Sequence, residues 1–125
     1  MAYKNKSALN RLQKHLDFLS QLSKAKTKVR RHQLLTIATP EQLQTVCECI
    51  KNVLRGTVRV GITGSQKNYL KRYKPIFDIL LQKRKRVPLE AKRGLLIQKG
   101  GFLPALLTPV LSIAGSLLGS LMRNI

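Results

Sequence analysis

The sequence of 125 residues contains no tryptophan, only two cysteines and two histidines, and five acidic residues. Cys47 and Cys49 are two positions apart, so on a helix they point about 200° away from each other and cannot share a metal ion or a disulfide. His15 and His32 are distant in sequence, and no pair of carboxylates occurs in a polar setting. We therefore expect no enzyme: no catalytic residue, no metal site, no cofactor and no small-molecule substrate.

The start of the sequence, MAYKNKSALNRL, also lacks the apolar run of a secretory signal. We therefore expect the chain in a reducing compartment, where its cysteines are core thiols rather than a disulfide. Its length is enough for one small domain and an appendage, and a second independent core is not expected.

The scarcity of acidic residues leaves a large excess of positive charge. Twenty-four Lys and Arg give a net charge of +19, which favours a polyanionic partner, either nucleic acid or anionic lipid. Residues 1–35 hold nine basic and one acidic residue, and residues 63–99 hold eleven and two. Two basic blocks therefore flank a nearly neutral middle.

Apolar spacing and helix signals predict an all-α fold, a small bundle of four to five short helices with a C-terminal amphipathic, hydrophobic helix. Thr39-Pro40-Glu41-Gln42 is typical of a helix start, and the helix it begins is expected at the centre of the core. Pro75 should kink or split the fourth helix, and an extended linker is expected over residues 57–62. The predicted helices cover residues 5–24, 27–37, 39–55, 65–81 and a short segment ending near Gln98.

The run Lys83-Arg84-Lys85-Arg86 predicts a nuclear localisation signal or a phosphate-binding patch. The alternative is a solvated helix end, because cations are favourable at a helix C-terminus. The residues that we expect to contact nucleic acid are Lys24, Lys26, Lys28, Arg30, Arg31, Lys67, Lys71, Arg72, Lys74, Lys83, Arg84, Lys85, Arg86, Lys92 and Arg93.

The last segment differs sharply from the basic part, since no charged residue occurs between Gly100 and Met122. The Gly100-Gly101 pair predicts a hinge that divides a basic helical domain, 1–99, from an amphipathic tail, 100–125. Such a tail can lie in a membrane interface, pack against a copy of itself or dock on a capsid groove; alternatively, its leucines complete the core of the domain. Its expected membrane or partner contacts are Phe102, Leu103, Leu106, Leu107, Val110, Leu111, Leu117, Leu118 and Leu121.

Basic residues followed by Gly100-Gly101-Phe102-Leu103-Pro104 and an aliphatic tail resemble the adenovirus core protein X, the precursor of the cationic mu peptide. Similar small virion proteins occur in adintoviruses and Maverick/Polinton elements. The resemblance covers about 25 residues and implies a virion protein packaged with the genome, present in the host nucleus during assembly. It also implies protease cleavage between Gly101 and Phe102, although Gln98 stands where the adenoviral pattern has Met, Ile or Leu.

Two functions of different classes follow, together with a third, weaker one. The first is a minor virion protein that neutralises and condenses double-stranded DNA without reading its sequence, while the tail engages membrane or capsid. The second is a membrane-active, lytic protein whose basic domain binds anionic lipid. The third is a cellular helix-turn-helix protein formed by residues 39–55 and 65–81, although a linker of about nine residues exceeds that motif's turn.

Overall fold

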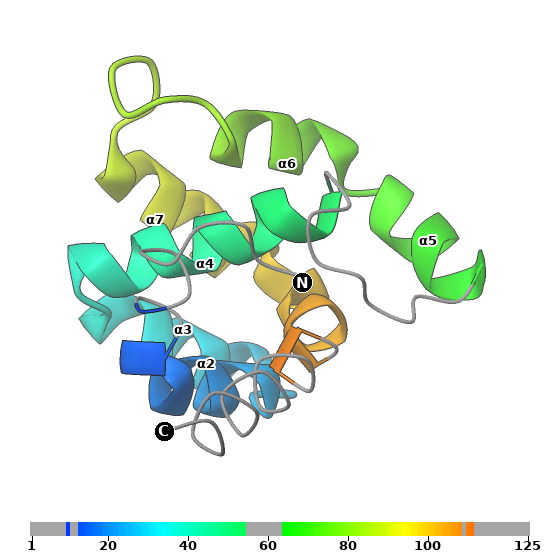
Figure 1. The fold of residues 1–125 in the computed structure, drawn as a ribbon, viewed down its shortest axis with the longest axis horizontal. Helices are drawn as coiled ribbons and strands as arrows, with labels where there is room; N and C mark the ends of the chain where they lie inside the picture. The colour runs from blue at the N-terminus through cyan, green and yellow to red at the C-terminus, as the bar shows by residue number, and fades with distance from the viewer. Residues whose placement is uncertain (1–9, 11–12, 55–63, 109, 112–125) are drawn as a thin grey trace, which may run out of the picture.

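The computed structural model describes residue 10 and residues 13–54, 64–108 and 110–111, with the side chains of 64–67 excepted. Over these residues the protein is all-α, as the sequence predicts, with six α-helices, one 3₁₀ turn and no strand (Figure 1). The elements are α2 (Leu16–Ser23), α3 (Lys28–Ile37), α4 (Pro40–Leu54), α5 (Gly64–Lys71), α6 (Lys74–Leu80), α7 (Leu89–Lys99) and η1 (Gly100–Phe102).

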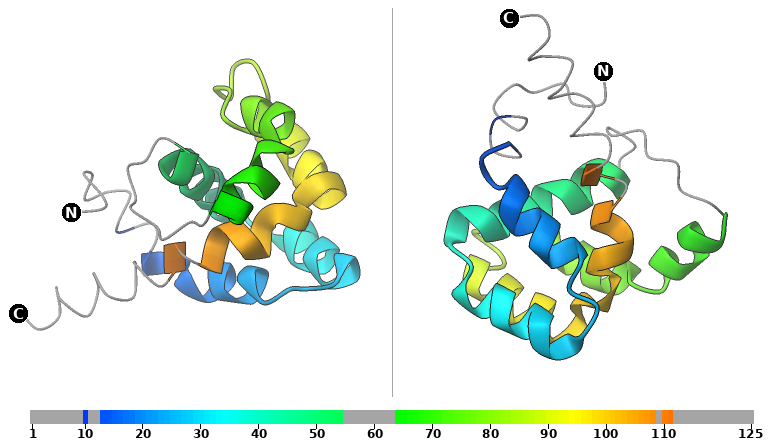
Figure 2. Two further views of the ribbon diagram at one scale, coloured as in Figure 1. Left: turned by 90° about the vertical axis from the view of Figure 1, so that its right-hand side faces the viewer. Right: turned by 90° about the horizontal axis from the view of Figure 1, so that it is seen from below.

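Helix α7 is the hub of the bundle, since it contacts α3, α4, α6 and η1. In Figures 1 and 2, α6 lies on one side of α4, whereas α2 and α3 lie on the other side. Helix α5 lies at the margin of the bundle. Helix α4 buries Leu43, Val46 and Ile50 completely, so it forms one wall of the core that α7 completes.

Two helices begin with side-chain caps, and the cap of α4 is the one predicted from Thr39 and Gln42. The Gln42 amide donates to Thr39 Oγ1 at 3.1 Å, and the Thr39 amide donates to Gln42 Oε1 at 2.9 Å. This reciprocal pair satisfies two amides that the helix itself leaves without acceptors. Thr27 caps α3 in a simpler way, because its hydroxyl accepts from the Arg30 amide at 3.2 Å.

The helix expected over residues 65–81 is split into α5 and α6. The break falls at Arg72 and Tyr73, and Pro75 is the second residue of α6. Proline fits the first turn of a helix because an amide there needs no helical acceptor. The split accounts for a sixth helix where four to five were expected; the linker expected at 57–62 lies outside the described residues.

The beginning of the tail is part of the core. Phe102, Leu103, Leu106, Leu107 and Val110 are fully buried, and residues 103–108 are helical. The Phe102 ring packs against Phe77 at a centroid distance of 4.8 Å and against Tyr73 at 5.1 Å.

The prediction of membrane or partner contact is therefore wrong for these five side chains, and the alternative, in which the tail completes the core, describes this segment. Burying five large apolar side chains in the same core as α2, α4 and α6 is favourable because it removes apolar surface from water. Leu111 is half-buried, whereas Leu117, Leu118 and Leu121 lie outside the described residues.

The Gly100-Gly101 pair forms a compact turn rather than an open hinge. Gly100 is buried, and a Cβ atom there would lie 3.0 Å from Leu103 Cδ1, so glycine permits the close packing. The peptide bond after Gly101 belongs to η1 and precedes a fully buried Phe102. A protease that binds extended chain would require η1 to unfold first.

Candidate nucleic-acid interface

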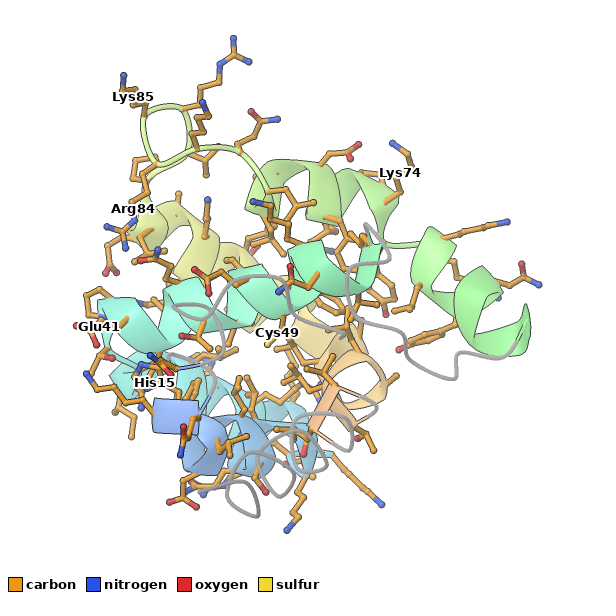
Figure 3. The ribbon with its side chains drawn as sticks, viewed as in Figure 1. His15, Glu41, Cys49, Lys74, Arg84 and Lys85 are labelled. Atoms are coloured by element: carbon orange, nitrogen blue, oxygen red, sulfur yellow. The ribbon has the colours of Figure 1, made fainter. Side chains whose placement is uncertain are left out.

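The four consecutive cations form an exposed turn between α6 and α7. Helix α6 ends at Leu80, so the run at 83–86 is a separate loop and not a helix end. The Arg86 amide donates to the Lys83 carbonyl at 2.9 Å, which closes the turn. Arg84 Nη2 donates to Gln44 Oε1 at 2.9 Å and so ties the turn to α4, while Lys85 points outward (Figure 3).

A second group of cations lies at the other end of α6. Lys71, Arg72 and Lys74 are exposed, and Lys74 pairs with Asp78 at 3.1 Å. Figure 3 shows Lys74 and Lys85 on the same side of α4. Helix α6 has seven residues and is only about 10 Å long, so the cations at its two ends can belong to one surface. We call these cations together the α6 surface: Lys71, Arg72, Lys74, Lys83, Arg84, Lys85 and Arg86.

A further basic region surrounds the beginning of α3, on the opposite side of α4. It comprises Lys24, Lys26, Lys28, Arg30 and Arg31, which we call the α3 surface. Arg31 is half-buried, and its Nη1 donates to the Ala25 carbonyl at 3.1 Å, while the other four are exposed. The structure thus distributes most of the predicted nucleic-acid contacts over two surfaces. They approach each other at Tyr73, which stands between Arg72 and Lys74 and lines a hollow together with Lys28 and Arg31. The Lys67 side chain lies outside the described part of the chain.

Two predicted contacts, Lys92 and Arg93, serve the fold instead. Lys92 is 6% exposed and its ammonium donates to the Gln82 carbonyl. Arg93 Nη1 donates at 2.7 Å to both the Leu35 and the Ala38 carbonyl. The last carbonyls of a helix lack partners within it, so Arg93 caps the end of α3.

Arg93 is also held by an ion pair, because its Nε lies 2.9 Å from Glu90 Oε2. The expectation that Lys92 and Arg93 bind phosphates is therefore wrong for this conformation, since both cations are already engaged with backbone or carboxylate oxygens.

The sequence analysis missed Lys99 and Tyr73. Together with Lys28 and Arg31 they line a surface hollow of about 220 Å³ between the end of α7 and the beginning of α3. The signal for Lys99 was its position directly before Gly100-Gly101, at the edge of the second basic block. Nothing in the sequence connects it with Lys28, which is 71 positions away (99 − 28).

The cysteines and one histidine are not members of either basic surface. Cys49 is buried, and burial raises the pKa of the half-buried Cys47 thiol from 9.0 to about 11. His15 is buried with its Nε2 3.8 Å from Glu41 Oε2. Lys14 hydrogen-bonds the Glu41 carboxylate at 3.1 Å and holds the pKa of Glu41 below its ordinary value.

Two other kinds of site are absent from the described residues. No group of three or more His, Cys, Asp or Glu side chains in this part of the chain is placed to hold a metal ion. None of its helices combines the length and the apolar character that a membrane crossing requires.

Comparison with protein-family models gives no match for this chain, and comparison with curated proteins and with solved structures gives none either. Evidence for a function therefore comes from the two basic surfaces alone.

Proposed function

We propose that this protein binds double-stranded DNA through its phosphates, without reading the base sequence. The observation that carries the proposal is the pair of exposed basic surfaces on opposite sides of α4. Five carboxylates cannot neutralise twenty-four cations, so most of the exposed Lys and Arg lack a carboxylate of their own. Such cations release counterions from DNA when they contact phosphates, and that release supplies most of the affinity.

The helix-turn-helix alternative has little support in the fold. Base readout requires a continuous helix that presents its side chains to the major groove. The segment expected to provide that helix is broken at Arg72 and Tyr73, between α5 and α6.

The turn at 83–86 and helix α3 lie on different sides of α4, so the outer parts of the two surfaces suit condensation of DNA. One surface can contact one duplex segment while the other contacts a second segment, so a single chain bridges the two. This is the behaviour expected of a minor virion protein that accompanies a packaged genome, which is what the resemblance to adenovirus core protein X implies. The role is one of binding and not of catalysis.

The membrane-active alternative is less well supported. Its tail needs an apolar face free to insert, whereas Phe102, Leu103 and Leu106 are buried in the core. Any contact of the tail with membrane, capsid or a second copy is therefore assigned to Leu117, Leu118 and Leu121, beyond the described residues.

The proposal is tested by titrating unrelated duplexes with the protein at several salt concentrations. If about six phosphates are contacted, affinity falls roughly a thousandfold between 50 and 200 mM salt, alike for all sequences. A salt-independent affinity, or a strong preference for one duplex, contradicts the proposal.

A variant of the α6 surface sharpens this test. The slope of log K against log salt is negative, and each phosphate contact contributes about 0.9 to its magnitude. Replacing Lys83, Arg84, Lys85 and Arg86 by Ala should therefore reduce that magnitude by up to about 3.6. Lys51→Ala, which removes one exposed cation of α4 outside both surfaces, should lower it by no more than about 0.9. Circular dichroism must show unchanged helix content, since Arg84 also bonds Gln44.

Bridging has its own readout, the light scattering of long DNA mixed with protein. Neutralising either surface alone should abolish condensation while duplex binding through the other surface persists. Condensation that survives the loss of one whole surface would show that bridging does not need both.

A further inference from the structure

The hollow at the end of α7 gathers polar groups from three separate parts of the chain. Its volume is about 220 Å³, and its lining includes Lys28 and Arg31 of α3, Tyr73 before α6, Lys99, and both glycines of η1. None of the described residues that line it carries a carboxylate. The hollow therefore combines positive charge with a hydroxyl group in a concave space.

The groups around the hollow are held in place before any ligand arrives. Arg31 Nη1 donates to the Ala25 carbonyl, which leaves its Nη2 directed elsewhere. The Tyr73 ring packs against Phe102 at 5.1 Å and Phe77 at 6.3 Å. The Tyr69 hydroxyl lies 3.4 Å from both the Gly101 carbonyl oxygen and the Tyr73 hydroxyl, so it links η1 to the residue before α6. A preorganised site loses less entropy on binding than a set of mobile side chains.

Gly101 leaves open the space that these groups surround. A Cβ atom on Gly101 would lie 3.8 Å from Tyr73 Oη and 3.9 Å from Arg31 Nη2. The hydroxyl and the guanidinium therefore approach the same point above the glycine. An anion oxygen in that space could accept a hydrogen bond from Arg31 and one from Tyr73, whose single proton is available when Tyr69 donates to the Tyr73 hydroxyl, 3.4 Å away. Lys28 and Lys99 lie at the margin of the hollow.

Favourable interaction with the C-terminus of α7 does not account for the number of cations around the hollow. The C-terminus of a helix carries the equivalent of about half a negative charge, whereas Lys28, Arg31 and Lys99 supply three positive charges beside the end of α7. Lys28 is the first residue of α3, whose positive end further opposes the partial charge of α7. The hollow keeps a surplus of positive charge.

We infer that this hollow is a built site for one phosphate group of a nucleic-acid backbone, bound by Lys28, Arg31, Lys99 and Tyr73 above Gly101. The inference rests on the proposed function and adds a fixed anchoring point to an otherwise diffuse electrostatic interaction.

The test is a titration of the full-length, isotope-labelled chain with inorganic phosphate at low ionic strength. Binding is monitored through the backbone amide resonances in NMR spectra, and chloride serves as the control anion. The resonances of Lys28, Lys99 and Gly101 should shift saturably with phosphate. Gly101→Ala places a methyl group between Tyr73 and Arg31 without changing the charge, and should weaken phosphate binding at least about tenfold, the effect of losing one charge-assisted hydrogen bond.

Gly94→Ala is the matched control. A Cβ atom there meets nothing within 4 Å, so this variant adds the same methyl group at an open site of α7 and should bind phosphate as the unaltered chain does. A second pair of changes, Lys28→Gln with Lys99→Gln, should weaken phosphate binding more than Lys24→Gln with Lys26→Gln, although both remove two charges.

Three outcomes overturn the inference. One is a phosphate response absent from the hollow or equal in Gly101→Ala and Gly94→Ala. Another is a duplex affinity that Gly101→Ala leaves unchanged, although replacement of residues 83–86 by alanine weakens it. That result would support the proposed function but exclude the anchoring site. If vesicles containing phosphatidylglycerol shift these resonances and duplex DNA does not, the assignment to nucleic acid is wrong.

Discussion

Removal of the tail is the sharpest test of how this protein holds together. Truncation after Lys99 deletes Phe102, Leu103, Leu106, Leu107 and Val110, all fully buried. At about 1.5–3 kcal/mol for each buried side chain, the loss is about 8–15 kcal/mol. A domain of this size has only about 5–15 kcal/mol of net stability. We expect the fragment 1–99 to be unfolded, with low helical circular dichroism and no cooperative thermal transition.

The control is truncation after Leu111, which keeps every core side chain that the structure describes. That fragment should unfold cooperatively on heating. A fragment 1–99 that melts cooperatively, and within a few degrees of the longer one, would refute the assignment of these residues to the core and restore the hinged-tail interpretation.

A single substitution in the tail tests the same assignment without deleting the segment. Leu107→Ala leaves a cavity in the core and should cost about 2–5 kcal/mol of unfolding free energy in urea titrations. Val29, which is 68% exposed on α3, provides the comparison. Val29→Ala should change stability by less than about 0.5 kcal/mol.

Three further predictions concern caps and ionisation. Thr39→Ala should cost about 1 kcal/mol of unfolding free energy in urea, because the Gln42 amide loses its acceptor; an unchanged midpoint would contradict a capping role. Arg93→Ala should cost more than Arg30→Ala in the same assay, because Arg93 bonds carbonyls at the end of α3 while Arg30 is exposed. The raised pKa of Cys47, about 11, means that its thiol alkylates slowly at pH 8 until the chain unfolds. The associated stability is complete below pH 9 and is lost as the pH rises towards 11, because the unfolded thiol ionises first.

Local sequence was sufficient wherever neighbouring residues decide the structure. The start of α4 follows from Thr39 and Gln42, whose hydrogen bonds join residues three positions apart. The predicted helix at 27–37 agrees with α3, and Pro75 splits a helix as expected. Whether the tail packs into the core depends instead on tertiary contacts with distant parts of the chain. A glycine pair fits both a hinge and a tight turn, and only packing around Leu103 distinguishes them.

The candidate site was predictable in composition but not in arrangement. Basic residues were recognised by type, yet nothing local separates Arg30, which is exposed, from Arg93, which caps another helix. The hollow joins Lys28, Tyr73 and Lys99 across long stretches of chain. Their proximity depends on how α3 packs against α7, a tertiary contact that the helical pattern of either segment does not encode.

The buried tail and the excess charge are connected through stability. A net charge of +19 repels itself in the compact state and lowers the free energy of unfolding. The side chains at 102–110 oppose that repulsion by adding apolar burial without adding any charge. A polyanion that binds the folded surfaces removes repulsion directly, and binding to the folded state alone raises stability by mass action. Duplex DNA should therefore stabilise this protein against unfolding, most strongly at low salt, where the repulsion and the binding are both at their greatest.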